Sequence, residues 1–306
     1  MKEYVVGAKL PPSGLFERPN SREWRHVGFN HPFLFALDYD AHDPATLYLA
    51  AGNGLIRAAD GGSKWTILTG SDVTELRDVA VDRNASGTIY FAHVAGIRVS
   101  KDRGATWRDA SGNLRRKYTE ALRVDTRHAG ILLAGTEEGI FRSENGGDSW
   151  QLVGAAGFQI LHIEQSPAQP CNWLATTEMG GVFASRDCAR SFESAGSIGV
   201  GRNLYDLAFD ATDPERVAIA GWGFGVAISH DGGKSWQFRN SGLPRTDVWS
   251  VAFDPAQPGR MYAAVHEEAV YRSDDAGVHW MRDGQDGSIV LRMKFVPVIG
   301  QGESRR

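Results

Sequence analysis

Short apolar-rich runs separated by polar turns recur along the whole chain, whereas the apolar spacing of an amphipathic helix is hard to find. Residues 76–82, 88–92 and 96–100 are three such runs in succession, and a fourth begins at Trp107. Runs of this length, with glycine and small polar residues between them, are typical of β-strands. The pattern therefore predicts an all-β protein made of many short strands.

Six octets of residues resemble one another and divide the chain into repeats. The octets occupy residues 58–65, 100–107, 143–150, 185–192, 229–236 and 273–280. Their closing aromatic residues are 42, 43, 42, 44 and 44 residues apart, and an eroded seventh copy ends at Trp24, 41 residues before Trp65. This is the period of a four-stranded propeller blade.

Each octet is predicted to form the turn between the third and fourth strands of its blade. In the second octet, Asp102 would accept hydrogen bonds from backbone N–H groups of the turn, Gly104 would supply an unusual φ, and Trp107 would pack between blades. A residue that recurs by repeat belongs to the architecture rather than to a site. We expect a structural role for Asp60, Asp102, Asn145, Asp187, Asp231 and Asp275.

The two ends of the chain together supply one more blade. Three strands are expected near residues 4–9, 14–17 and 24–27, and a lone strand is expected at residues 289–296. Pairing the ends closes the ring and removes exposed sheet edges. The predicted fold is all-β: a single seven-bladed β-propeller of four-stranded antiparallel blades, spanning residues 1–306 and closed by three N-terminal strands plus one C-terminal strand.

The octets resemble the BNR or Asp-box repeat family, whose pattern is Ser-x-Asp-x-Gly-x-Thr-Trp. The second octet reads Ser-Lys-Asp-Arg-Gly-Ala-Thr-Trp and the fifth reads Ser-His-Asp-Gly-Gly-Lys-Ser-Trp, so the resemblance covers nearly the whole chain. It implies a propeller fold. Because the family includes sialidases, xyloglucan-degrading hydrolases, sortilin-type receptors and photosystem II assembly factors, it does not fix a function.

Composition and charge narrow the class of partner. A net charge of -4 and a pI near 6.1 give no basic surface for nucleic acid. No run approaches the roughly 20 apolar residues that span a bilayer, and no signal-peptide stretch follows Met1. We expect a monomer with no nucleic-acid partner and no membrane insertion. The compartment stays open, since an extracytoplasmic location would follow if a leader had been removed.

Aligning the first strands of the blades reveals one polar column between apolar neighbours. The column contains Ala36, Asp78, Ala121, His162, Asp206, Ser250 and Arg292. It predicts a polar ring near one mouth of the axial channel, on the face opposite the octets. One interpretation is a polar lining that water or hydrogen-bond partners satisfy. The other is a functional site.

The second interpretation gives a hypothesis for catalysis. Asp78 and Asp206 come from blades three apart and would face each other across the mouth, with His162 and Arg292 between them. Glycoside hydrolases use two carboxyl groups, one on each side of the glycosidic bond that is cleaved. The candidate catalytic residues are Asp78, Asp206, Glu120 and His162, and the candidate ligand-binding residues are Arg292, Arg77, Arg202, Tyr205, Trp222 and Trp249.

Several aromatic residues are expected on the same face. Trp222 and Phe224 lie in a glycine-rich turn, and Trp249 and Tyr205 begin nearby strands. They would form a platform for a sugar or a peptide, or else pack between blades. Because no complete catalytic constellation can be assembled, the favoured function is a binding propeller that presents its axial mouth to a carbohydrate or a protein segment. A glycoside hydrolase is the alternative.

Two cysteines belong to one repeat. Cys171 begins a second strand and Cys188 lies in the fourth octet, which lacks both its glycine and its tryptophan. A disulfide between them would compensate for the eroded octet and would indicate an oxidising compartment; two free thiols are the alternative. The sequence has no metal-ligand spacing, phosphate loop or nucleophile elbow, so no metal and no cofactor are expected.

Overall fold

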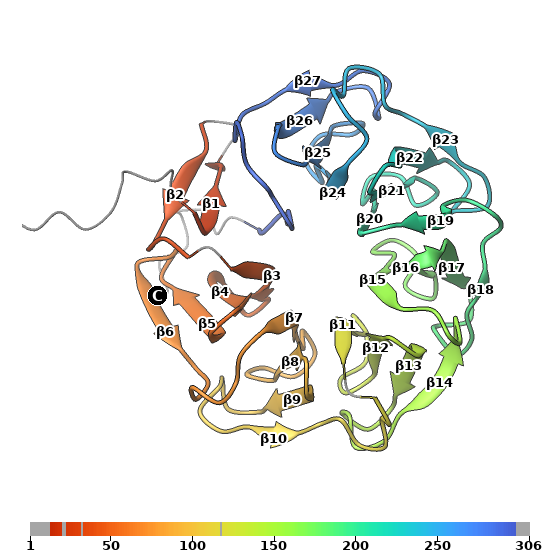
Figure 1. The fold of residues 1–306 in the computed structure, drawn as a ribbon. Helices are drawn as coiled ribbons and strands as arrows, with labels where there is room; N and C mark the ends of the chain where they lie inside the picture. The colour runs from red at the N-terminus through yellow and green to blue at the C-terminus, as the bar shows by residue number, and fades with distance from the viewer. Residues whose placement is uncertain (1–12, 20–22, 32, 117, 298–306) are drawn as a thin grey trace, which may run out of the picture.

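The computed structural model describes residues 13–19, 23–31, 33–116 and 118–297, whose elements β1 to β27 are all β-strands. Six antiparallel sheets stand as blades around a common axis (Figure 1); five of them have four strands, and one has a fifth strand beside its four. Each sheet follows chain order from an inner strand at the axis to an outer strand at the rim. Across these residues, we find no helix long and apolar enough to cross a membrane. The predicted all-β propeller of four-stranded antiparallel blades is confirmed.

The first three blades follow the repeats seen in the sequence. Blade 1 contains β3 (Leu34–Asp40), β4 (Asp43–Ala51), β5 (Gly54–Ala59) and β6 (Lys64–Ile67). Blade 2 contains β7 (Leu76–Val81), β8 (Ile89–His93), β9 (Gly96–Ser100) and β10 (Arg108–Asp109). Blade 3 contains β11 (Thr119–Val124), β12 (Leu132–Thr136), β13 (Gly139–Ser143) and β14 (Gln151–Gly154).

The next three blades repeat this plan, with one additional strand. Blade 4 contains β15 (Ile160–Gln165), β16 (Trp173–Gly180), β17 (Val182–Ser185) and β18 (Glu193–Ser194), and β19 (Val200–Asn203) pairs with the end of β16. Blade 5 contains β20 (Asp206–Phe209), β21 (Val217–Gly221), β22 (Gly225–Ser229) and β23 (Gln237–Phe238). Blade 6 contains β24 (Val248–Phe253), β25 (Met261–Val265), β26 (Ala269–Ser273) and β27 (Met281–Arg282).

The hydrophobic core lies between blades rather than inside any one of them. One buried cluster joins Tyr48 and Ala50 of blade 1 to Val79, Ile89 and Phe91 of blade 2. Because a blade has neighbours on both faces, its second strand is covered twice, and every residue of β8, β12, β21 and β25 is buried. This explains why these segments are almost continuously apolar in the sequence.

The octets form the turns after the third strands. In the second octet, the Asp102 carboxylate accepts the Ser100 hydroxyl at 2.7 Å and the backbone N–H of Thr106 at 2.9 Å. Hydrogen bonds from the side chains of Thr106 and Ser100 lower the pKa of Asp102 to about 2. Trp107 donates its indole N–H to the carbonyl of Leu68 in blade 1, 3.0 Å away, and so links two blades.

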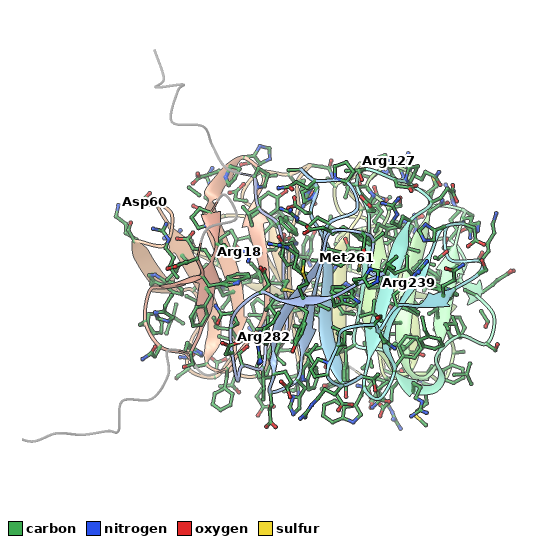
Figure 2. All side chains as sticks on the ribbon, turned by 90° about the horizontal axis from the view of Figure 1, so that it is seen from above. Arg18, Asp60, Arg127, Arg239, Met261 and Arg282 are labelled. Carbon is green, nitrogen blue, oxygen red and sulfur yellow. A yellow bond between two sulfur atoms is a disulfide. The ribbon has the colours of Figure 1, made fainter. Side chains whose placement is uncertain are left out.

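The other octets vary this arrangement. A serine hydroxyl donates to the side chain two residues later in the octets of Asn145, Asp187, Asp231 and Asp275. In the first octet Ala58 replaces the serine, and Asp60 pairs with Lys64 at 2.7 Å. Asp60 and Arg127, which lies in the turn after β11, point toward the same face of the ring (Figure 2). We call the opposite face the mouth face.

A disulfide joins the fourth octet to the segment that precedes β16, as one of the two predicted alternatives for the cysteines required. Cys171 and Cys188 are bonded, and their Cα atoms are 3.7 Å apart. The backbone N–H of Cys188 also donates to the carbonyl of Cys171 at 3.1 Å. Ala189 adopts a φ of 62° where the second octet has Gly104 at 88°, a conformation that disfavours a side chain. A covalent link thus lies beside the turn that lost its glycine.

The two ends of the chain form fewer strands than the predicted seventh blade requires. The two-stranded sheet of β1 (Leu15–Glu17) and β2 (Arg25–Val27) lies between blade 6 and blade 1 (Figure 1). The strand expected at residues 4–9 lies outside the described residues. Residues 289–297 run inward toward the axis but join no sheet ladder in the described part of the chain. The described residues therefore contain six four-stranded blades, not seven.

Candidate functional site

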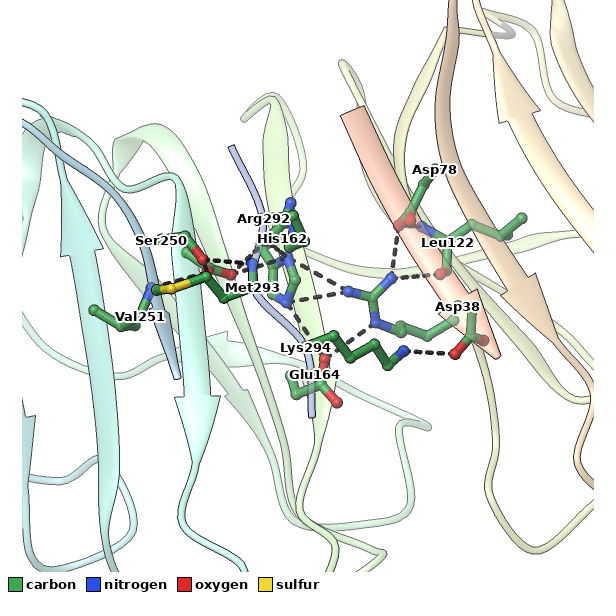
Figure 3. A network of polar contacts seen from close by, with 12 residues as sticks. Asp38, Asp78, Leu122, His162, Glu164, Ser250, Val251, Arg292, Met293 and Lys294 are labelled. Atoms are coloured by element: carbon green, nitrogen blue, oxygen red, sulfur yellow. Dashed lines mark hydrogen bonds and ion pairs between the residues drawn. The ribbon is translucent and has the colours of Figure 1, made fainter. Parts of the chain in front are cut away.

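The polar column predicted from the alignment lies on the innermost strands and converges on the axis. Asp78, His162 and Asp206 are 5%, 3% and 2% exposed, and Arg292 enters from the C-terminal segment (Figure 3). We call the set of polar residues that meet there the axial network. Its members are Asp38, Asp78, Arg123, His162, Glu164, Asp206, Ser250, Arg292 and Lys294.

Asp78 is saturated by hydrogen-bond donors. Its carboxylate accepts the backbone N–H of Val79 at 2.9 Å, the backbone N–H of Leu122 at 2.9 Å and Nη1 of Arg123 at 2.6 Å. Burial opposes the charge on Arg123, but Asp78 and Glu164 outweigh that effect and raise its pKa. These contacts link blade 2 to blade 3 through a buried carboxylate.

Asp206 has an equivalent environment on the other side of the axis. One carboxylate oxygen accepts the Ser250 hydroxyl at 2.6 Å and the backbone N–H of Val251 at 3.1 Å. The other accepts a hydrogen bond from Arg292. Asp206 thus links blade 5 to blade 6 by the same kind of carboxylate-to-backbone bond that Asp78 makes.

His162 separates the two halves of the network, as expected from the sequence. Its Nδ1 lies 2.7 Å from Nη1 of Arg292, and its Nε2 lies 3.1 Å from Nη2 of Arg123 and 3.3 Å from the Glu164 carboxylate. Burial lowers the pKa of His162, and the two guanidinium groups lower it further. A neutral ring that accepts from Arg292 at Nδ1 and donates to Glu164 from Nε2 satisfies two of these three partners, because a protonated Nε2 cannot also accept from Arg123.

The column did not include four members of the axial network. Arg123, Glu164, Asp38 and Lys294 lie two residues after column positions, and Lys294 Nζ is 2.6 Å from Asp38. Residues two apart on a strand share a face. A second aligned column, two residues further along the inner strands, would therefore have predicted these four members.

A second group of side chains lies on the mouth face of blades 5 and 6. Tyr205 and Trp249 stack with ring centroids 4.3 Å apart, and Trp222 meets Trp249 and His266 edge-on at 5.9 and 4.9 Å. The Trp249 indole N–H donates to Nδ1 of His266 at 2.8 Å. We call these four residues the aromatic cluster. Phe224, which the sequence grouped with them, is instead buried against Phe238, with ring centroids 5.0 Å apart.

The aromatic cluster is open to solvent, unlike the axial network. Trp222 is 40% exposed, and Tyr205, Trp249 and His266 are partly exposed. The turn that carries Trp222 is fixed on two sides: its N–H donates to the carbonyl of Asn203 in β19, and the N–H of Gly223 donates to Asp247 at 2.9 Å. The extra strand β19 therefore supports the exposed indole.

Glu120 lies apart from both groups, on the mouth face of blades 2 and 3. Its carboxylate accepts the Tyr118 hydroxyl at 2.5 Å and lies 3.7 Å from Nε of Arg77. Burial and the neighbouring Glu120 raise the pKa of Tyr118. The Arg77 guanidinium lies 5.4 Å from the Tyr118 ring and 5.5 Å from the Phe35 ring. Glu120 is thus not brought into contact with the axial carboxylates.

The described part of the chain contains a shallow hollow, and no metal centre is found in it. The hollow, about 530 Å³, lies at the rim of blade 3, and it is lined by Arg115, Arg116, Glu137, Glu138, Phe141, Leu152 and Gly157. No group of three or more His, Cys, Asp or Glu side chains with metal-binding geometry occurs among the described residues.

Comparison with known proteins agrees with the repeat pattern. Residues 227–238, which include the fifth octet, match the BNR/Asp-box repeat family. A xyloglucanase of Paenibacillus sp is 25% identical over 301 aligned residues, which cover 87% of this chain and 27% of that enzyme. The chain therefore spans about a quarter of the curated relative that it matches.

Two solved structures show the same fold. The GH74 xyloglucanase of Xanthomonas campestris superposes with a TM-score of 0.69 at 19% identity, covering 82% of this chain and 45% of that one. The structure of YCF48 bound to D1 peptide gives a TM-score of 0.62 at 20% identity and covers 82% of both chains. Repeats, family match and neighbours agree: the chain is a propeller of the BNR, or Asp-box repeat, type.

Proposed function

We propose that this protein is a binding propeller that presents the aromatic cluster to a carbohydrate chain. The observation that carries the proposal is the exposed Trp222 indole, held beside Trp249 and Tyr205 on the mouth face. Aromatic faces bind the apolar C–H face of a pyranose ring, and exposed apolar surface framed by polar groups is typical of ligand sites. The xyloglucanase relative supports a carbohydrate as the ligand.

The state of the axial carboxylates favours binding over catalysis. Glycoside hydrolysis needs one carboxylic acid that is protonated and reaches the substrate. Asp78 and Asp206 are buried, and each accepts an arginine and backbone N–H groups. We infer that they hold blades together, because breaking either contact would leave a buried charge without a partner.

A glycoside hydrolase is the second candidate, and the xyloglucanase relative favours it. Under this hypothesis Asp78, Asp206, Glu120 and His162 would supply the acid and base groups. Glu120 is the most accessible of them, with a side chain 26% exposed. A protein segment is the alternative occupant of the mouth face, since YCF48, which shares the fold, has been solved with a peptide bound.

We also infer that the whole chain is one domain whose ring has a seventh blade, made of N-terminal strands and the inner segment 289–296. The support is a repeated contact: the Met293 N–H donates to Ser250 at 3.2 Å, just as the N–H groups of Val251 and Leu122 donate to Asp206 and Asp78. Removing residues 289–306 should therefore lower the free energy of unfolding far more than removing residues 298–306 alone. Equal stability of the two truncations would contradict the closure.

A glycan array followed by product analysis tests the function. We expect neutral and acidic glycans to be retained without cleavage, and the Trp222→Ala variant to lose retention. Xyloglucan is the first substrate for product analysis by chromatography. Cleavage that Asp78→Asn or Asp206→Asn abolishes would overturn the binding proposal in favour of the hydrolase. Absence of any bound glycan would leave the protein segment as the occupant.

A further inference from the structure

The arginines of the mouth face differ in whether a carboxylate already binds them. Arg77 lies 3.7 Å from Glu120, Arg116 lies 3.5 Å from Glu137, and Arg245 lies 3.3 Å from Glu268. At the axis, Arg123 and Arg292 pair with Asp78 and Asp206. Each of these guanidinium groups therefore already has a carboxylate partner within the protein.

Arg202 has no such partner. It is exposed, and within the described ranges its side chain makes neither an ion pair nor a hydrogen bond. Arg115 shares this property, but it lies at the hollow of blade 3, away from the aromatic cluster. Of the arginines beside the aromatic rings, Arg202 is the one whose charge is available to a ligand.

The position of Arg202 relative to the rings is fixed by the backbone. It belongs to β19, which pairs with β16 through Glu178 and Asn203 on one side. On the other side, the carbonyl of Asn203 accepts the N–H of Trp222 at 3.0 Å. A Cβ placed on Gly223 would lie 3.4 Å from Nη1 of Arg202. The guanidinium therefore borders the turn that carries the exposed indole.

An acidic residue that contacts the Trp222 turn does not neutralise this arginine. Asp247 lies across the same turn, and its Oδ1 is occupied by the N–H of Gly223 at 2.9 Å. No ion pair joins Asp247 to Arg202 in the structure. The border of the aromatic cluster thus presents a stacking surface and, beside it, an unneutralised planar cation with several N–H donors.

We propose that the carbohydrate taken by the aromatic cluster carries a carboxylate, as a uronic acid residue does, and that Arg202 binds it. The proposal rests on the carbohydrate-binding function proposed above. Stacking on Trp222 positions the pyranose ring, and the guanidinium accommodates a carboxylate with two parallel N–H bonds. Arg202 is then the residue that selects acidic over neutral sugars.

Calorimetry with matched oligosaccharides tests the proposal on the full chain. The probes are oligogalacturonate, oligoglucuronate, xyloglucan oligosaccharide and a sulfated oligosaccharide of similar length, at low and physiological salt. We expect the uronates to bind at least about tenfold more tightly than the neutral probe, which corresponds to 1.4 kcal/mol. Arg202→Gln should remove this preference, and Arg202→Lys should retain only part of it because lysine lacks the planar fork.

Arg245→Gln is the matched control, since Arg245 lies on the same face but is paired with Glu268. It should keep the uronate preference, and thermal unfolding of both glutamine variants should match the parent. Equal binding of uronate and neutral probes would overturn this inference while leaving the proposed function intact. Tighter binding of the sulfated probe would overturn the carboxylate assignment. No binding of any probe would instead overturn the proposed function.

Discussion

The axial network lies on the innermost strands and the aromatic cluster lies on the mouth face of blades 5 and 6, and the two differ in how their polar and aromatic groups are satisfied. In the network, Asp78 and Asp206 are almost fully buried, and both oxygens of each of these two carboxylates accept a hydrogen bond. In the cluster, the Trp222 ring is 40% exposed, and the side chain of Arg202 at its border has no ion-pair or hydrogen-bond partner among the described residues. A concentration of charged residues is therefore weak support for a site when the charges satisfy one another.

The two regions also differ in whether their contacts recur from blade to blade. The network repeats one contact between successive blades, in which an inner side chain accepts a backbone N–H of the next blade. The cluster lies where the repeat is interrupted by β19, an extra strand outside the four of its blade. Contacts that recur around the ring stabilise it, whereas a local departure from the repeat needs another explanation.

The largest expected effect is on stability and lies in the network. Arg123→Met should lower the free energy of unfolding by about 3–5 kcal/mol, because it leaves the buried Asp78 carboxylate without its cation and also removes an ion-pair partner of Glu164. Denaturant unfolding measures the change. Arg245→Met, which breaks an exposed ion pair, is the control and should cost at most about 1 kcal/mol. Similar losses for both variants would show that the buried ion pair of the network is no more important for stability than an exposed one.

The next effect is on binding and lies in the cluster. Trp222→Ala should weaken carbohydrate binding about tenfold, or about 1.4 kcal/mol, because it removes the exposed stacking surface. The melting temperature should hardly change. Phe238→Ala removes another exposed aromatic ring, 60% exposed on β23, and should leave affinity unaltered. Calorimetry and thermal unfolding on the same samples check both statements.

A smaller effect concerns pH and the neutral His162. Its folded pKa lies below the unfolded value of about 6.5, so the unfolded chain gains a proton first as the pH falls. The free energy of unfolding should therefore decrease below about pH 6.5, by at most about 1.4 kcal/mol per pH unit for one group. His162→Gln should flatten this slope. A residual slope of the same sign is expected from His93, whose pKa burial also lowers.

The smallest expected effect concerns a cation of the axial network that is partly exposed to solvent. Lys294 is 31% exposed and pairs with Asp38, which also accepts the backbone N–H groups of Tyr39 and Val81. Lys294→Gln should cost no more than about 1 kcal/mol, because the carboxylate keeps two donors and some access to water. A loss as large as that of Arg123→Met would show that burial does not set the magnitude.

Much of the architecture could be predicted because it repeats. The octets and their spacing indicated propeller blades, and the four expected runs from residue 76 onward became β7, β8, β9 and β10. Residues in one repeat meet only their neighbours, so local pattern determines the blade. Ring closure could not be settled in this way, since it depends on contacts between the two ends of the chain.

The candidate site was predicted in part. The alignment placed Asp78, His162 and Asp206 in one column, and in the structure Arg123 and Arg292 connect these three side chains. The column omitted Arg123 and Glu164, and their presence changes the chemistry of the whole group. The pattern of residue types along one strand predicts which side chains point toward the axis. It does not predict which long side chains of other blades contact them.

The sequence by itself determined the blades, the role of the octet turns and the presence of aromatic residues on the mouth face, because these follow from short-range pattern and strand periodicity. Only the tertiary structure decided which charges neutralise each other. That outcome depends on distances across the axis between residues such as Asp78 and Arg123, which are 45 positions apart in the chain. It also decided that Trp222 stays exposed while Phe224, two residues away, is buried, because burial is set by the neighbouring blade and not by residue type.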